Sequence, residues 1–197
     1  MAAEPLPEMP LHTAAARGAS ASELTALMCE YPEAVSQEDT NGMLPLHHAC
    51  AHGRASPAAT LALLRAYPGA AQARAVGGLL CLHLACDKRG EHTAEIVTLL
   101  LDAGSEGNAG GWPGAASSPD RRGRLPLHAA AASGAGVSVA RALLAADRKA
   151  ASATDAAGAT PAHYAAATAE SAETLVLLLD VHGQARALAT NSHPSKC

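Results

Sequence analysis

Apolar residues along this chain gather in short groups that are separated by polar turns. In one group, Ile96, Leu99 and Leu100 follow the i, i+3, i+4 spacing that places side chains on one face of an α-helix. Comparable leucine-rich groups recur at Leu27-Met28, Leu63-Leu64, Leu99-Leu100-Leu101, Leu143-Leu144 and Leu177-Leu178-Leu179. The turns are rich in Asp, Asn and Gly, as in Asp39-Thr40-Asn41-Gly42. The pattern therefore predicts five apolar helices linked through polar turns.

A second, shorter helix is predicted ahead of each leucine group, where one tetrapeptide recurs. Its copies are Met9-Pro10-Leu11-His12, Leu44-Pro45-Leu46-His47, Leu80-Cys81-Leu82-His83, Leu125-Pro126-Leu127-His128 and Thr160-Pro161-Ala162-His163. Their second residues lie 35, 36, 45 and 35 positions apart. Proline is tolerated in the first helical turn, and a glycine such as Gly53 can end the helix with a positive φ. In the second copy we place this helix at roughly Leu46–His52.

The repeated unit resembles the ankyrin repeat. Residues 120–131 read DRRGRLPLHAAA, close to the family pattern D-x-x-G-x-T-P-L-H-x-A-A, and residues 99–109 look like L-L-L-x-x-G-A-D-V-N-A. The resemblance implies an all-α solenoid of about five helix-turn-helix repeats with short hairpin-like turns, over residues 9–189. Residues 1–8 and 190–197 would then be tails.

The chain also departs from the family pattern. Most units have 35 or 36 residues where the family has 33, and we place the extra length after the second helix, at Tyr31-Pro32 and Tyr67-Pro68, because proline cannot continue a helix. Residues 110–118 are rich in Gly, Pro and Ser and predict a flexible, protruding insertion. Residues 189–194 look like the start of a further turn.

The composition fits a stack of thin layers. The chain has 50 alanines and no phenylalanine among 197 residues, so a thick core of large side chains is not expected. We interpret the alanines as spacers that let helix backbones approach, and Cys50 and Cys86 as small buried groups, with Cys81 partly shielded. Five cysteines without C-x-x-C spacing predict no disulfide framework and no zinc ribbon. We expect an intracellular protein, cytoplasmic or nuclear.

Several classes of function are disfavoured. A net charge of −4 and a pI near 6.2 argue against nucleic acid as a partner. No apolar run is long enough to span a membrane. The motifs of serine hydrolases, zinc proteases and phosphate-binding loops are absent from the sequence. We therefore expect no enzyme activity and no cofactor.

Ten histidines raise the possibility of metal binding. In ankyrin repeats the tetrapeptide histidine forms hydrogen bonds within and between neighbouring turns, so we assign that structural role to these five. His48 and His52 are four residues apart on one predicted helix, so both rings can face the same way. Two histidines leave a zinc site two ligands short. A metal-binding protein remains an alternative, as does a pH-sensitive contact.

The resemblance implies a partner-binding surface made by the turn tips and the inner helices. The predicted residues are Thr40, Asn41, Met43, His48, His52, Leu84, Asp87, Lys88, Trp112, Arg121, Arg122, Arg124 and Tyr164. Arg121, Arg122 and Arg124 put three guanidinium groups on one turn and suit carboxylates or phosphates of a partner. A merely solvated basic turn is the alternative. Trp112, in the insertion, would be an interface anchor or would fold back over neighbouring helices.

These observations predict a noncatalytic module or scaffold that binds another protein on its concave face. We expect a monomer. The alternative is a regulatory or targeting segment of a larger ankyrin-containing enzyme, such as a ubiquitin ligase or a kinase.

Overall fold

The computed structural model describes residues 9–103, 114–168 and 172–191. In these parts the chain forms helices that come in successive pairs, and no strand. The first helices of the pairs are α1 (Pro10–Arg17), α3 (Pro45–Ala51), α5 (Cys81–Cys86), α7 (Pro126–Ser133) and α9 (Pro161–Ala167). The second helices are α2 (Ala21–Glu30), α4 (Pro57–Ala66), α6 (Thr93–Ala103), α8 (Val137–Ala146) and α10 (Ala172–Asn191). The all-helical architecture predicted from the sequence is confirmed.

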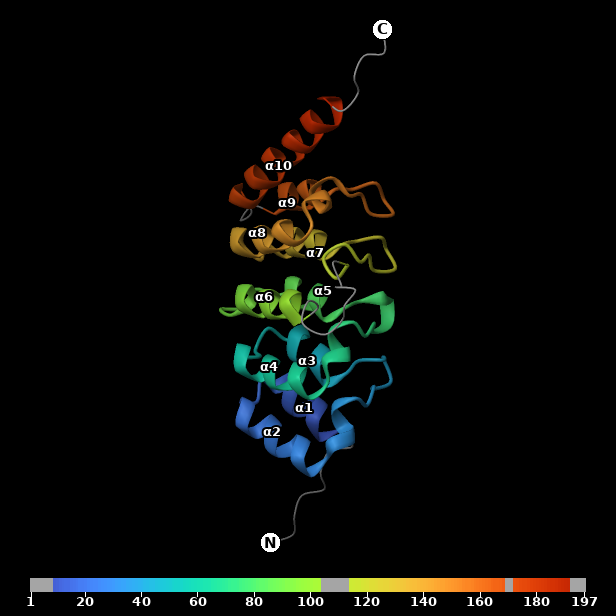
Figure 1. Ribbon diagram of the computed structural model, residues 1–197, viewed down its shortest axis with the longest axis vertical. Coiled ribbons are helices and arrows are strands. Elements are labelled where there is room, and N and C mark those ends of the chain that lie inside the picture. Colours follow the sequence, from blue (N-terminus) through green and yellow to red (C-terminus); the bar gives the residue numbers. More distant parts are fainter. Residues whose placement is uncertain (1–8, 104–113, 169–171, 192–197) are drawn as a thin grey trace.

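The pairs stack along one axis (Figure 1). The short first helices form a central column, α2, α4, α6 and α8 form a second column beside it, and the turns project on the opposite side. Helix α10 closes one end of the stack and runs away from it at an angle. An array of this kind presents a long surface, because each layer contacts only its neighbours.

Small residues and leucines fill the space between layers. Leu127, Ala131 and Ala140 are fully buried, and they belong to one continuous apolar cluster. Alanine leaves the helix axes free to approach, which is the spacer role inferred from composition. Cys50 and Cys86 are buried as expected, but Cys81 is fully buried and not partly shielded, because it lies in the first turn of α5 between layers. Burial raises the pKa of the Cys81 and Cys86 thiols, so both stay protonated.

The extra residues of the first, second and fourth units form short 3-10 helices. Helices α2 and α4 end before Tyr31-Pro32 and Tyr67-Pro68, and η1 (Pro32–Val35) and η2 (Pro68–Ala71) follow. A related segment, η4 (Arg148–Ser152), follows α8 although it has no proline. These segments bury alanines against the stack: Ala34, Ala70, Ala71, Ala150 and Ala151. The added length therefore widens these three layers on the side that leads to the turns.

Three predicted segments differ from the observed ones. In the segment predicted as a protruding insertion, residues 114–117 form a turn in which Ala116 is only 2% exposed, and residues 110–113 lie outside the described part. Helix α10 continues to Asn191, past the end expected at residue 189. In the second unit the first helix is Pro45–Ala51, one residue earlier at each end than predicted. No helix in the described residues is long and apolar enough to cross a membrane.

The spacer role of alanine can be tested at Ala131. Ala131→Leu places a large side chain between layers that have no room for it, so we expect a loss of about 1–3 kcal/mol in the free energy of unfolding. Urea unfolding followed by helical circular dichroism measures the change. Ala145→Leu on the exposed side of α8 is the matched control, and we expect it to stay within about 0.5 kcal/mol of the native chain. Equal effects of the two substitutions would contradict the spacer role.

Candidate partner-binding surface

The tetrapeptide histidine joins each layer to the next. In the second unit, the N–H of Leu44 donates to Nδ1 of His47 (3.1 Å), and the ring's Nε2 lies 3.0 Å from the carbonyl oxygen of Ala73 in the following unit. His83 and His128 repeat this arrangement. Their Nδ1 atoms accept from the N–H groups that begin their own helices, and their Nε2 atoms reach the carbonyl oxygens of Arg124 (3.1 Å) and Ala159 (3.2 Å). The structural role expected of the five tetrapeptide histidines is therefore observed in full at these three. In the fifth unit, Nδ1 of His163 accepts the N–H of Thr160 (3.0 Å) within its own turn.

This geometry fixes the protonation state of the rings. Because a backbone N–H can only donate, Nδ1 must be unprotonated, and the single ring proton lies on Nε2, where it donates to the next unit. Burial lowers the pKa of His47, His83 and His128, so the neutral form is favoured. His12 differs, because its Nε2 contacts the carbonyl oxygens of both Gln37 and Met43, and its buried Nδ1 has no partner among the described residues.

An aspartate organises three of the turns from inside. Oδ1 of Asp120 accepts the N–H groups of Arg122 (2.8 Å) and Arg124 (2.9 Å), and Asp39 and Asp155 accept the equivalent pairs in their own turns. Gly123 completes the turn with a φ of +74°. A Cβ atom at Gly123 would lie 3.0 Å from the backbone nitrogen of Ala156 in the next turn, so glycine allows the close approach of neighbouring turns.

Backbone hydrogen bonds hold the turn tips in register. The N–H of Val76 donates to the carbonyl oxygen of Asn41 (3.0 Å), that of Arg121 to Gly77 (2.8 Å), and that of Ala156 to Arg122 (2.9 Å). Four successive tips are therefore tied at fixed spacing. Residues 40–41, 76–77, 121–122 and 156–157 lie at these four tips and together form one edge of the molecule.

Three of the predicted binding residues stabilise the turns instead of standing free. The second carboxylate oxygen of the turn aspartate accepts from His48 in the second unit (2.9 Å), from Arg124 in the fourth (2.9 Å) and from the Tyr164 hydroxyl in the fifth (2.6 Å). The sequence predicted that three guanidinium groups on the fourth turn would be available to a partner, but only two of them are. Arg124 is tied to Asp120, whose side chain is 3% exposed, whereas the side chains of Arg121 and Arg122 are exposed with no such bond in the described residues.

The turn aspartates are held in their charged form. Burial alone would raise the pKa of Asp120, but the N–H of Arg124, its guanidinium group and the N–H of Arg122 together lower it. Burial is likewise outweighed at Asp39, where the N–H of Met43 and the His48 ring lower the pKa. The Tyr164 hydroxyl makes the largest contribution to the lowered pKa of Asp155.

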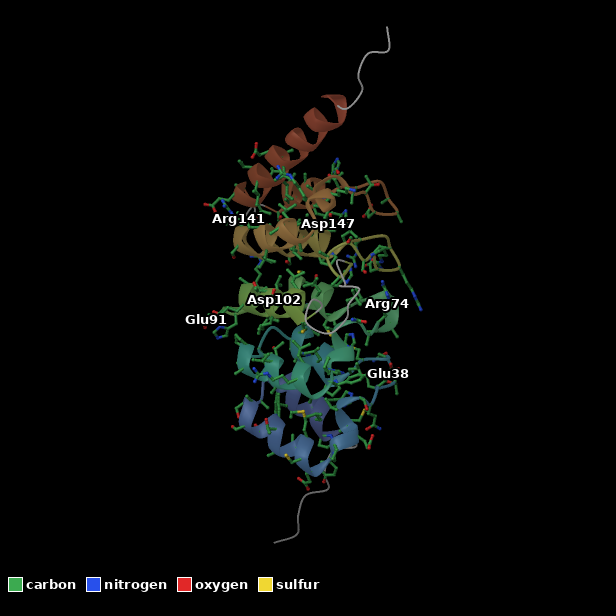
Figure 2. The ribbon with its side chains drawn as sticks, in the orientation of Figure 1. Glu38, Arg74, Glu91, Asp102, Arg141 and Asp147 are labelled. Carbon is green, nitrogen blue, oxygen red and sulfur yellow. The ribbon has the colours of Figure 1, made fainter. Side chains whose placement is uncertain are left out.

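The sequence prediction missed two residues of this edge. Val76 is 59% exposed at the tip between Asn41 and Arg121, and Arg74 donates through Nη1 to the carbonyl oxygens of Gly78 (2.9 Å) and Pro119 (3.0 Å). Val76 occupies the turn position of Thr40 and Arg121, so aligning the turns would have identified it. Figure 2 places Arg74 and Glu38 on the side of the tips, opposite Glu91 and Arg141.

The other predicted residues are spread along the same face. Thr40 and Asn41 are exposed on the first tip and Met43 is half-buried beside them. Leu84 lies on α5, half-buried, and Asp87 and Lys88 follow this helix and form an ion pair at 3.1 Å. Trp112 lies outside the described residues.

The rings of His48 and His52 stack with centroids 6.1 Å apart, and so face the same way as predicted. His48 is bonded to Asp39, and Nδ1 of His52 lies 2.9 Å from the carbonyl oxygen of His48. In the part of the chain that the structure describes, no group of three or more His, Cys, Asp or Glu side chains is arranged to hold a metal ion.

The histidine bonds predict a loss of stability in mild acid. The pKa values of His12, His47, His83 and His128 are lowered in the folded chain, so the unfolded chain binds more protons below its histidine pKa of about 6.5. This stabilising contribution is complete above that pH and is lost as pH falls towards the folded values. We expect urea unfolding midpoints to decline from pH 7.5 to pH 5.5. The turn aspartates do not contribute there, because their lowered pKa values keep them charged throughout this pH range.

His83→Gln identifies the source of this pH dependence. The variant removes one titrating group, so we expect the free energy of unfolding to vary less steeply with pH than in the native chain. Leu82→Ala, at a neighbouring buried residue, is the control. It lowers stability by about 2–5 kcal/mol without changing the slope. A slope unchanged by His83→Gln would contradict the assignment.

The three arginines of the fourth turn should differ in how much they contribute to the free energy of unfolding. Arg124→Ala removes a bond to a buried carboxylate, and we expect a loss of about 1–2 kcal/mol in the free energy of unfolding. Arg121→Ala and Arg122→Ala should stay within about 0.5 kcal/mol of the native chain. Thermal unfolding of the three variants measures this. Equal losses for the three variants would contradict the conclusion that Arg124 stabilises the turn and that Arg121 and Arg122 do not.

Comparison with known proteins agrees with this geometry. The family model described as ankyrin repeats (3 copies) matches residues 82–187, which is more than half of the chain. No curated protein matches it. The matched region contains the histidine bonds from the third unit to the fifth and the aspartate turns of the fourth and fifth units. The chain therefore belongs to the ankyrin-repeat family.

Proposed function

We propose that this chain is a noncatalytic module of five ankyrin repeats that binds another protein along the turn tips and the inner helices. Ankyrin repeats generally act as protein-binding modules and are generally noncatalytic. The first two units lie outside the matched region, but they share its helix pairs, its histidine bonds and, in Asp39, its turn. That shared bonding supports counting them as repeats. The reduced thiols fit an intracellular setting.

The observation that carries this proposal is the ordered edge of tips. Arg121 and Arg122 are exposed there beside Val76, and the backbone that bears them is fixed by bonds to both neighbouring turns. Because the backbone of the tips is already held, binding there orders only the side chains and not the backbone, which lowers the entropy cost. An exposed valine beside free guanidinium groups suits a partner segment with an apolar residue next to carboxylates.

The test compares partner affinity between variants of the full chain. A partner is first isolated by proximity labelling in the source cell, and its affinity is then measured for the native chain and for Arg121→Ala/Arg122→Ala. We expect a loss of about tenfold or more and a weaker dependence on salt, because two charge contacts are removed. Arg65→Ala on the exposed side of α4 is the matched control and should bind normally. Unchanged affinity and salt dependence in the double variant would refute a role for these tips.

A further inference from the structure

Helix α10 leaves an open groove at one end of the stack. It diverges from the direction of the other outer helices (Figure 1), and a groove of about 510 Å³ lies between its first half and α8. The lining residues come from both helices: Val137, Arg141, Ala172, Glu173, Val176, Leu177 and Asp180. This groove lies away from the tips, since Arg141 is on the side of the molecule opposite Arg74 (Figure 2).

Helix α10 carries two apolar faces, and only one of them is covered. Leu178 is fully buried and Val181 is 9% exposed where they face the stack. Val176 and Leu179 are 67% and 55% exposed, and their i, i+3 spacing places them on the same side of the helix. Among the described residues, the only other exposed large apolar side chain is Val76, at the tips. Val176 also lines the groove, so this uncovered apolar pair lies at its α10 wall.

The groove carries a positive charge on one wall and negative charges on the other. Arg141 lies on the α8 wall, and Glu173 and Asp180 lie on the α10 wall. Among the described residues, neither Arg141 nor Glu173 forms an ion pair. A ligand of a single sign would leave one of these charges facing its like. In a dimer with two-fold symmetry, each member of the Arg141 and Glu173 pair instead faces the opposite member in the second copy. Arg141 of one copy can then meet Glu173 of the other, on both sides of the axis.

We propose that this groove is the contact face of a symmetric dimer, and that the same groove of a second copy of this chain occupies it. Val176 and Leu179 pack near the two-fold axis, and two reciprocal Arg141–Glu173 pairs flank them. The arrangement closes on itself, so assembly stops at two copies. It leaves the tips of both copies exposed. A dimer differs from the monomer expected from the sequence, and it does not depend on the function proposed for the tips.

The test is the mass of the full chain in solution, measured by sedimentation or light scattering from about 1 µM to about 200 µM. We expect a dimer whose fraction rises with concentration. Val176→Glu and Arg141→Glu should each raise the dissociation constant about tenfold or more. Combining Arg141→Glu with Glu173→Arg reverses both charges of the pair, and dimer formation should return to within about threefold of the native chain. Circular dichroism confirms that each variant is folded.

Two controls make the outcome specific. Arg65→Glu changes an exposed arginine on α4, and Arg121→Ala/Arg122→Ala changes the tips; both should dimerise normally. Four results would overturn the proposal. These are a monomer at every concentration, a dimer that is indifferent to the groove variants, a failure of the double reversal to restore the dimer, and growth into larger open assemblies.

Discussion

In the second, third and fourth units, a single imidazole links the local fold of the chain to its long-range order. The ring of His83 accepts the first N–H of its own helix and reaches a carbonyl oxygen of the next unit, 41 residues along the chain. One side chain thus caps a helix, fixes its own tautomer and sets where the following turn lies. His47 and His128 do the same in their units, and the alternating donor and acceptor roles work only for a neutral ring. Stacking therefore depends on burial that keeps these rings uncharged.

Alanine makes these bonds possible. The bond from His128 to Ala159 requires neighbouring first helices to approach closely, and the fully buried Ala131 occupies the space between such layers. Larger residues there would push the layers apart and separate the rings from their carbonyl oxygens. Thin layers also explain why the molecule offers long edges and grooves, since a stack one helix pair deep has little interior in which to enclose a ligand.

Side chains on the exposed faces divide into those that stabilise the stack and those that remain available. The sequence predicted three of these residues, Arg124, His48 and Tyr164, to bind a partner. In the structure each of them bonds to the aspartate of its own turn. Arg121 and Arg122 differ from Arg124 only in their place on the turn, and that place leaves them exposed. The available groups lie in two regions, the tips and the groove beside α10. The stack could therefore use two separate contact surfaces without either disturbing the other.

The sequence by itself determined the repeating unit, its helix pairs, the structural histidines and the spacer role of alanine. Each of these follows from local spacing or from a composition that every unit shares. The tertiary structure alone decided which polar residues are available, because the choice between Arg121 and Arg124 depends on which of them reaches the carboxylate of Asp120. It also decided that Cys81 is buried between layers and that α10 keeps an uncovered apolar face. Those properties depend on the angle and distance between neighbouring layers, and no pattern within one unit encodes them.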